Sequence, residues 1–348
     1  MIKTTRRQFT ALAAAAAATT LLGAAAKAQD AYTLKIHSFS GPQAPEAINM
    51  VLPFIEAVEE QSGGRLKMEF YPSMQLGGSA SDLVEQMEDQ VVDIIVAIPG
   101  LTPGRFSGLE GMDMPFTNVG TSQGQTAALL DFTNKYLLDN EFKGIKILHM
   151  HGTDAAVIHT TETQIESMDD MKGLKLRAPG RYTGEAVKAL GGTPVGLSLG
   201  ETYEALERSQ VDGMTINWAI MTPYKLQEVS KYHMENPLYQ NSIFVLMNQD
   251  SFDALPEDLQ KVIDDNIGFD KSVEIAGNID KLTDAAKATI SEEGGVLYSV
   301  SDEEIEKWKE AVRPVYQIWI DEMDKRGLPG QEMFDDIMAL TAKYGRPE

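Results

Sequence analysis

The sequence contains no cysteine and comparatively few basic residues. Its 348 residues include 30 lysines and arginines against 52 aspartates and glutamates, giving a formal net charge of −22 at pH 7. The lack of cysteine excludes disulfide bonds and cysteine-ligated metals, so a packed core must stabilise the fold. A chain of this length can bury such a core and is long enough for two domains. The acidic balance disfavours nucleic acid and anionic lipid, and we expect neither as a partner.

The sequence also lacks several motifs of common catalytic and nucleotide-binding sites. It has no G-x-x-x-x-G-K-[ST] phosphate loop, no H-E-x-x-H zinc motif and no G-x-G-x-x-G dinucleotide motif. We therefore predict a protein that is not an enzyme and needs no cofactor. Because carboxylate-based catalysis leaves no fixed motif, a secreted enzyme that acts on a small acid is kept as an alternative.

The N-terminus predicts an exported protein. Residues 5–9, TRRQF, form a twin-arginine pattern, an alanine-rich run covers 11–26, and AKA at 26–28 offers a small-x-small cleavage site. The run is shorter than the roughly 20 apolar residues of a membrane span, so we expect cleavage rather than anchoring. We interpret residues 1–28 as a signal peptide and place the mature protein in the periplasm. The twin-arginine route is predicted, with the Sec route as the alternative if the arginines are incidental.

Hydrophobic periodicity predicts an α/β fold with doubly wound sheets. Alternation over 32–37 predicts a strand, apolar residues at helical spacing over 48–58 predict a helix, and 66–70 predicts a second strand. After another helix, the apolar run 91–97 is typical of a strand buried on both faces. This β-α-β-α-β order favours a parallel sheet. A long helical pattern over 256–293 lies near the C-terminus.

A second α/β unit follows, and the chain is predicted to cross between two lobes near residues 150 and 242. We assign 29–150 with about 243–285 to lobe I, and 151–242 with about 286–348 to lobe II. Two lobes joined by such crossings suit a hinged receptor that closes on its ligand.

The most informative stretch is 173–213, which reads GLKLRAPGRYTGEAVKALGGTPVGLSLGETYEALERSQVDG. Its first strand ends at Arg177, immediately before the break Ala178-Pro179-Gly180. Open α/β sheets bind ligands beyond the ends of their strands, and a guanidinium matches a carboxylate with two parallel hydrogen bonds. We therefore predict that Arg177 binds a ligand carboxylate. The alternative is an arginine on an exposed strand end.

This block resembles the solute receptors of the tripartite ATP-independent periplasmic (TRAP) transporters, the DctP-type family, and the resemblance covers nearly the whole mature chain. It implies a two-lobed periplasmic-binding-protein fold, type II-like, with Arg177 on the ligand carboxylate. It also implies delivery of a small organic acid to TRAP membrane subunits, driven by an ion gradient. We expect a monomer that is not itself embedded in the membrane.

By the same resemblance, further polar and aromatic side chains are expected near the ligand. They are Phe39, Asn217, Trp218 and Phe244. Trp218 offers contact area and an N–H donor, with an ordinary half-buried tryptophan as the alternative. Arg181 starts the helix after Arg177 and is either a second anion contact or a solvated helix start.

The crossing into the second lobe adds His151 and Asp154. Family members often place a basic or polar ligand contact here, whereas this sequence has an aspartate and no nearby arginine. Asp154 therefore argues against a simple dicarboxylate or a sialic-acid-like ligand. It would suit a ligand ammonium, or it is a solvated loop acid. His149, His151 and His159 form a histidine cluster, but no further ligand is spaced to complete a metal site, and we predict none.

The predicted function is a periplasmic receptor that binds a small organic acid in an interlobe cleft. Sugar acids, hydroxy or keto acids, aromatic acids, sulfonates and zwitterions all remain open as ligands. Trp218 favours a ligand with an apolar or ring face, and Asp154 favours one with a donor group. The alternatives are a ligand-sensing module of the same fold and a receptor for an amine or zwitterion.

Overall fold

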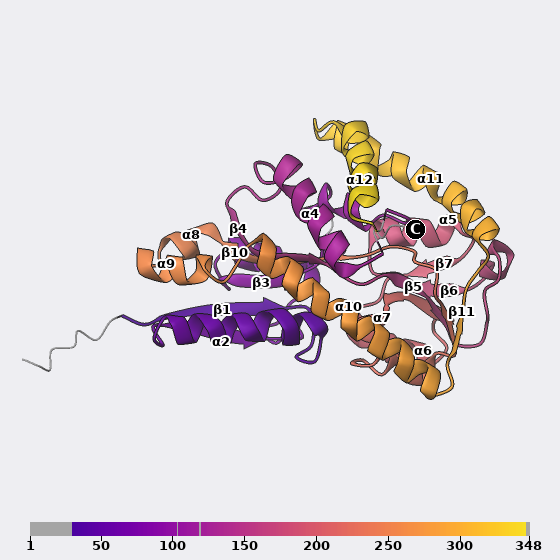
Figure 1. Cartoon of the computed structure of the whole chain (residues 1–348), viewed down its shortest axis with the longest axis horizontal. Coiled ribbons are helices and arrows are strands. Elements are labelled where there is room, and N and C mark those ends of the chain that lie inside the picture. Colours follow the sequence, from indigo (N-terminus) through magenta and orange to yellow (C-terminus); the bar gives the residue numbers. More distant parts are fainter. Residues whose placement is uncertain (1–29, 103, 118–119, 346–348) are drawn as a thin grey trace, which may run out of the picture.

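The computed structural model describes residues 30–102, 104–117 and 120–345. Two β-sheets, each flanked by helices, form a mixed α/β structure (Figure 1). The predicted signal peptide, residues 1–28, lies outside the described residues. Within the described ranges, no helix combines the length and apolar character that crossing a membrane requires.

The first sheet has the strand order β2-β1-β3-β10-β4. Its strands are β1 (Tyr32–Ser38), β2 (Leu66–Tyr71), β3 (Ile94–Ala97), β4 (Ile145–Gly152) and β10 (Ser242–Asn248). β1 runs parallel to β2 and β3, as the sequence predicted, whereas β10 is antiparallel to β3 and β4. β10 therefore returns to this sheet after the chain has built the second one.

Helices pack against the first sheet and bury its apolar residues. α2 packs against β2, and α4 packs against β4. The Thr121 side chain accepts a hydrogen bond from the backbone N–H of Gly124 at 3.0 Å and so caps the start of α4. The helical segments before β5 and directly after β10 are η1 (Ala47–Val51), α2 (Leu52–Gln61), η2 (Ala80–Asp82), α3 (Leu83–Glu88), η3 (Pro99–Leu101), η4 (Leu109–Asp113), α4 (Ser122–Tyr136), α8 (Gln249–Asp253) and α9 (Glu257–Asp264).

The second sheet has the strand order β11-β9-β5-β8-β6-β7. β8 pairs in parallel with β6 and antiparallel with β5. Its strands are β5 (Ala156–Thr160), β6 (Lys175–Arg177), β7 (Thr193–Val195), β8 (Gly213–Asn217), β9 (Tyr232–Met234) and β11 (Val296–Tyr298). The helical segments between them are η5 (Met168–Met171), α5 (Arg181–Ala189), α6 (Leu199–Glu207), α7 (Trp218–Met221) and η6 (Leu226–Val229).

One long helix, α10 (Phe269–Glu292), connects the two sheets. It contacts α4 and β4 of the first sheet region and α7 and β11 of the second, and Figure 1 shows it crossing the molecule diagonally. The sequence predicted one helical stretch over 256–293, but the structure interrupts it between α9 and α10 at Gly268. α9 ends at Asp264, and Gly268, whose backbone φ of +117° favours glycine, is the N-cap of α10.

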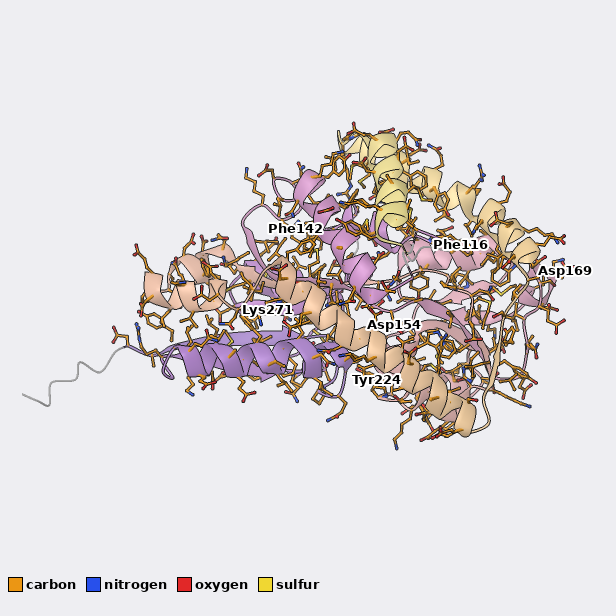
Figure 2. All side chains as sticks on the ribbon, in the orientation of Figure 1. Phe116, Phe142, Asp154, Asp169, Tyr224 and Lys271 are labelled. Atoms are coloured by element: carbon orange, nitrogen blue, oxygen red, sulfur yellow. The ribbon has the colours of Figure 1, made fainter. Side chains whose placement is uncertain are left out.

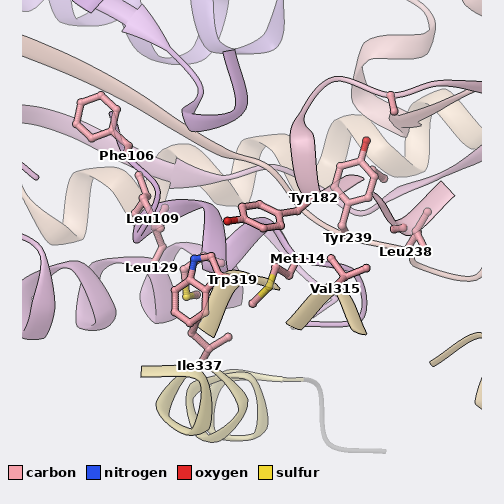
Figure 3. Close-up of a cluster of buried hydrophobic side chains, with 14 of the residues drawn as sticks. Phe106, Leu109, Met114, Leu129, Tyr182, Leu238, Tyr239, Val315, Trp319 and Ile337 are labelled. Carbon is pink, nitrogen blue, oxygen red and sulfur yellow. The ribbon is translucent and has the colours of Figure 1, made fainter. Parts of the chain in front are cut away.

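The C-terminal helices α11 (Asp302–Lys325) and α12 (Gly330–Tyr344) bind different parts of the molecule. α11 packs against α5, whereas α12 packs against α4, although the predicted lobe division placed both in lobe II. Trp319 of α11 is buried in a large apolar cluster (Figure 3). Its ring nitrogen donates to the carbonyl of Ser107 at 2.7 Å. A side chain at Gly111 would begin 2.4 Å from the Trp319 ring, so glycine is required there.

Candidate functional site

A cavity of about 430 Å³ lies between the two sheets. This volume falls within the range of small-molecule binding sites. The first sheet contributes β4, the loop after β1 and the loop after β3, and the second contributes the ends of β6 and β8 and the start of α6. Its wall is mostly apolar, formed by Phe39, Pro45, Met74, Ala80, Ile98, Leu101, Pro179, Leu199, Ile216, Ile220, Ile243 and Ile279.

The second sheet positions Arg177 at this cavity. Asp212 accepts a hydrogen bond from the backbone N–H of Lys175 at 2.7 Å and so ties the start of β6 to the start of β8. The next residue, Gly213, lets β8 lie close to β5, because a Cβ atom there would stand 2.4 Å from the carbonyl oxygen of His159. The Val-Asp-Gly end of the 173–213 block thus supports the strand that carries the arginine.

The Arg177 side chain is buried and lines the cavity. Its side chain is held by two backbone carbonyls, with Nε donating to Leu197 at 3.1 Å and an Nη atom donating to Thr215 at 3.4 Å. Arg177 is 5% exposed, and no carboxylate of the described residues forms an ion pair with it. Burial lowers the pKa of Arg177, but an arginine stays protonated in proteins. The cavity therefore holds a buried positive charge that lacks an anion.

Asn217 lines the cavity, and Asp154 holds it in place. The Asn217 amide nitrogen donates to one Asp154 oxygen at 2.7 Å, and the backbone N–H of Ala219 donates to the other at 3.0 Å. Burial raises the pKa of Asp154 to about 6. Asp154 itself is absent from the cavity wall, which corrects its predicted position: it is neither a solvated loop acid nor placed to meet a ligand ammonium. Because the hydrogen bond to Asp154 uses the amide nitrogen of Asn217, the side-chain oxygen of Asn217 stays available to a ligand.

Two further predicted residues, Phe39 and His151, line the cavity. Phe39 lies in the loop after β1 and adds to the apolar wall. His151 lies on β4 with His149, which packs edge-on against Phe54. His159 lies on β5 of the second sheet and forms a hydrogen bond with the ring of His233 at 2.9 Å. Among the described side chains, no group of three or more potential ligands could hold a metal ion.

Trp218 lies in the core rather than in the cavity wall, which corrects the sequence-based expectation. It opens α7 immediately after β8 and is 1% exposed. Its ring packs edge-on against His159 at 4.9 Å between centroids, and the Lys287 ammonium lies 4.8 Å above it. The same helical turn presents Ile220, not the tryptophan, to the cavity.

Phe244 is also a core residue, because the alternation of β10 turns it away from the cavity. Ile243 lines the cavity, and Phe244, the next residue, points to the opposite face of the sheet. There its ring packs against Phe106 at 4.9 Å and Phe142 at 6.4 Å between centroids. The sequence identified the correct strand but the wrong face.

Arg181 lies outside the main cavity and is mostly solvated, which fits the interpretation of this residue as a solvated helix start. Its guanidinium pairs with Glu322 of α11, and its side chain is 53% exposed. It borders a separate pocket of about 20 Å³ beside Glu110, a buried carboxyl whose pKa is raised to about 8 by burial and then by Glu322. Arg177 is therefore the one cationic side chain among the described residues of the cavity wall.

Two residues that the sequence analysis did not select also shape the cavity. The Tyr224 hydroxyl accepts a hydrogen bond from the backbone N–H of Gly41 at 3.0 Å, which joins the two sides of the cavity (Tyr224 is labelled in Figure 2). Ser198 lies within a G-x-S-x-G pattern at 196–200, the spacing of a nucleophile elbow. Its hydroxyl lies 2.5 Å from the Glu201 carboxylate in a capping box at the start of α6, so Ser198 has a helix-capping role.

The acidic residues of the wall do not neutralise Arg177. Glu46 is buried, and burial raises the pKa of its carboxyl, which favours the protonated form. Glu201 is bound to the backbone and hydroxyl of Ser198. The cavity thus combines one unpaired cation with a largely apolar wall, and this chemistry suits a small anion with an apolar body.

The fold and the cavity together define a two-lobed, ligand-binding receptor. Residues 38–322 match the bacterial extracellular solute-binding proteins of family 7 (DctP), and the chain belongs to this family. Its members are periplasmic binding proteins, not enzymes, and TRAP receptors bind a small molecule and deliver it to TRAP membrane subunits. The family and the two-lobed fold predicted from the sequence are confirmed.

Relatives with recorded ligands cover most of the chain. The C4-dicarboxylate-binding periplasmic protein DctP of Rhodobacter capsulatus is 25% identical over 299 residues, 83% of this chain and 85% of that protein. A TRAP solute-binding protein of Rhodoferax ferrireducens, solved with copurified benzoate, is 33% identical with a TM-score of 0.84 over 90% of this chain and 98% of that one. A marine metagenome TRAP receptor for aromatic acids, solved with 3-hydroxybenzoate, is 32% identical with a TM-score of 0.85 over 91% and 99%.

Proposed function

We propose that this TRAP receptor binds an aromatic monocarboxylate. The observation that carries the proposal is the buried Arg177 guanidinium, without an ion-pair partner among the described residues, in a mostly apolar cavity. A carboxylate would supply the missing anion. It would also accept hydrogen bonds from the guanidinium N–H groups that do not bond backbone carbonyls. An aromatic ring would fill the apolar wall. The two solved receptors with 32% and 33% identity hold benzoate-type ligands, which is consistent with this ligand class.

In this proposal, the two predicted lobes close around the ligand. Closure removes water from the cavity, and the attraction between Arg177 and the carboxylate strengthens because screening falls. Asn217, Phe39 and His151 line the space around the ring. The closed receptor then delivers the acid to TRAP membrane subunits. A monomeric state and export by the twin-arginine route belong to the same proposal.

A thermal-shift panel tests the ligand class. We expect benzoate and its derivatives to raise the melting temperature, whereas succinate, a hexuronate and a zwitterion such as ectoine leave it nearly unchanged. A ligand that binds only the native state adds about 2.7 kcal/mol of apparent stability at a hundredfold excess over its dissociation constant. Stabilisation by succinate, the hexuronate or the zwitterion, with no response to any aromatic acid, would contradict the proposal.

A further inference from the structure

His151 is a buried polar side chain in the cavity wall that has no hydrogen-bond partner among the described residues. It lies on β4, opposite Ile243 of β10, and is 1% exposed. Its Nδ1 atom is fully buried without a hydrogen bond, and within the described part of the chain its Nε2 atom has no partner either. A buried polar group without a hydrogen bond costs about 1–3 kcal/mol, so such a position calls for an explanation.

The imidazole of His151 is neutral over the physiological range. Burial lowers its pKa to about 3, and the charge of His149 on the same strand acts in the same direction. A neutral imidazole offers one N–H donor and one lone pair, and no positive charge. A second ligand carboxylate beside it would lack a counter-charge and would be costly to bury.

We propose that His151 hydrogen-bonds a hydroxyl group on the ligand, so that the receptor prefers a hydroxylated aromatic monocarboxylate to the unsubstituted acid. This inference rests on the proposed function. A hydroxyl both donates and accepts, so it can pair with either tautomer of the imidazole. Arg177 projects from the second sheet and His151 from the first, so one ligand can place its carboxylate and its hydroxyl on opposite sides of the cavity.

Asn217 and Glu46 are two further buried polar residues of the cavity wall. The Asn217 amide nitrogen already donates to Asp154 at 2.7 Å. The Glu46 carboxyl hydrogen-bonds within the protein, to Ser40 and to its own backbone, and these contacts partly offset the effect of burial on its pKa. His151 has no such contact with any residue that the structure describes. His151 is therefore the better candidate for a hydrogen bond to the ligand hydroxyl.

The test compares dissociation constants for benzoate and for 2-, 3- and 4-hydroxybenzoate by isothermal titration. We expect wild type to bind one hydroxybenzoate about tenfold more tightly than benzoate, the size of a net hydrogen bond. The His151→Leu variant should bind benzoate and the three hydroxybenzoates with similar affinity to one another and so lose the hydroxyl preference. His151→Asn, which can still donate and accept, should retain part of it.

His149→Leu is the matched control, because His149 lies on the same strand but packs against Phe54 outside the cavity wall. It should leave the hydroxyl preference unchanged. Equal binding of benzoate and all three hydroxybenzoates by wild type would overturn the role of His151 while leaving the proposed function intact. A preference that survives in His151→Leu would also overturn it and would point to Asn217 or Glu46. If neither benzoate nor any hydroxybenzoate binds, the proposed function fails and this inference fails with it.

Discussion

Replacing Arg177 with alanine is expected to weaken the binding of an aromatic carboxylate by about 3–5 kcal/mol, a loss of roughly a hundredfold to a few thousandfold. The substitution removes the one cation of the described cavity wall and leaves the ligand's charge buried without a partner. Because Arg177 bonds backbone carbonyls of Leu197 and Thr215, the variant also leaves these acceptors unpaired, and some loss of stability is expected. Isothermal titration measures the affinity, and circular dichroism checks that the variant is folded.

Arg181→Ala is the matched control for this experiment. It removes an arginine four residues along the chain that pairs with Glu322 and lies outside the main cavity. The affinity of Arg181→Ala for the aromatic acid should therefore match that of wild type. Unchanged affinity in a folded Arg177→Ala protein would contradict the role of Arg177. A large loss of affinity in Arg181→Ala alone would instead indicate that Arg181, at the start of α5, contacts the ligand's carboxylate, which was one of the two interpretations of Arg181 from the sequence.

Replacing Trp218 with alanine is expected to lower the free energy of unfolding by about 3–5 kcal/mol, because a large buried ring leaves a cavity that the core can only partly refill. The ring is packed between His159 and the Lys287 ammonium and is almost fully buried. Urea unfolding followed by circular dichroism measures this loss. In folded Trp218→Ala protein, saturating ligand should still raise the midpoint, since the substitution leaves the cavity wall intact.

Trp218→Phe separates a packing role from a ligand contact. A phenyl ring keeps most of the core contacts, so this variant should be less destabilised than Trp218→Ala and should bind the aromatic acid with nearly wild-type affinity. A stable Trp218→Phe protein that no longer binds the aromatic acid would indicate that Trp218 contacts the ligand, and it would contradict the packing role. The comparison therefore decides between the two interpretations that the sequence left open.

The sequence allowed prediction of the elements whose patterns are local. The alternation at 32–37, the apolar run 91–97 and the strand that ends at Arg177 all correspond to strands of the structure, β1, β3 and β6. The helical break at Gly268 was missed, because a single glycine is tolerated in many helices and only its backbone φ identifies the break. Short strands such as β7 and β9 were also missed, since three residues carry too little periodicity.

The site was predicted less completely than the fold, because neighbouring residues in a strand face opposite directions. A shift of one position exchanges Ile243, in the cavity wall, for Phe244, in the core. The role of Asp154 depends on Asn217, 63 positions later in the sequence, and no local pattern signals that hydrogen bond. Tyr224 reaches Gly41 across 183 positions and was missed for the same reason.

The most direct test of the central claim is a pair of titrations with benzoate and with benzamide. The two molecules have nearly the same shape, but only benzoate carries the negative charge that an unpaired, buried Arg177 requires. We predict that benzoate binds roughly 10²-fold more tightly or better, since a buried charge-assisted pair is lost with the amide. Equal affinities for the two molecules, or no binding of benzoate at all, would contradict the assignment of a carboxylate ligand to this cavity.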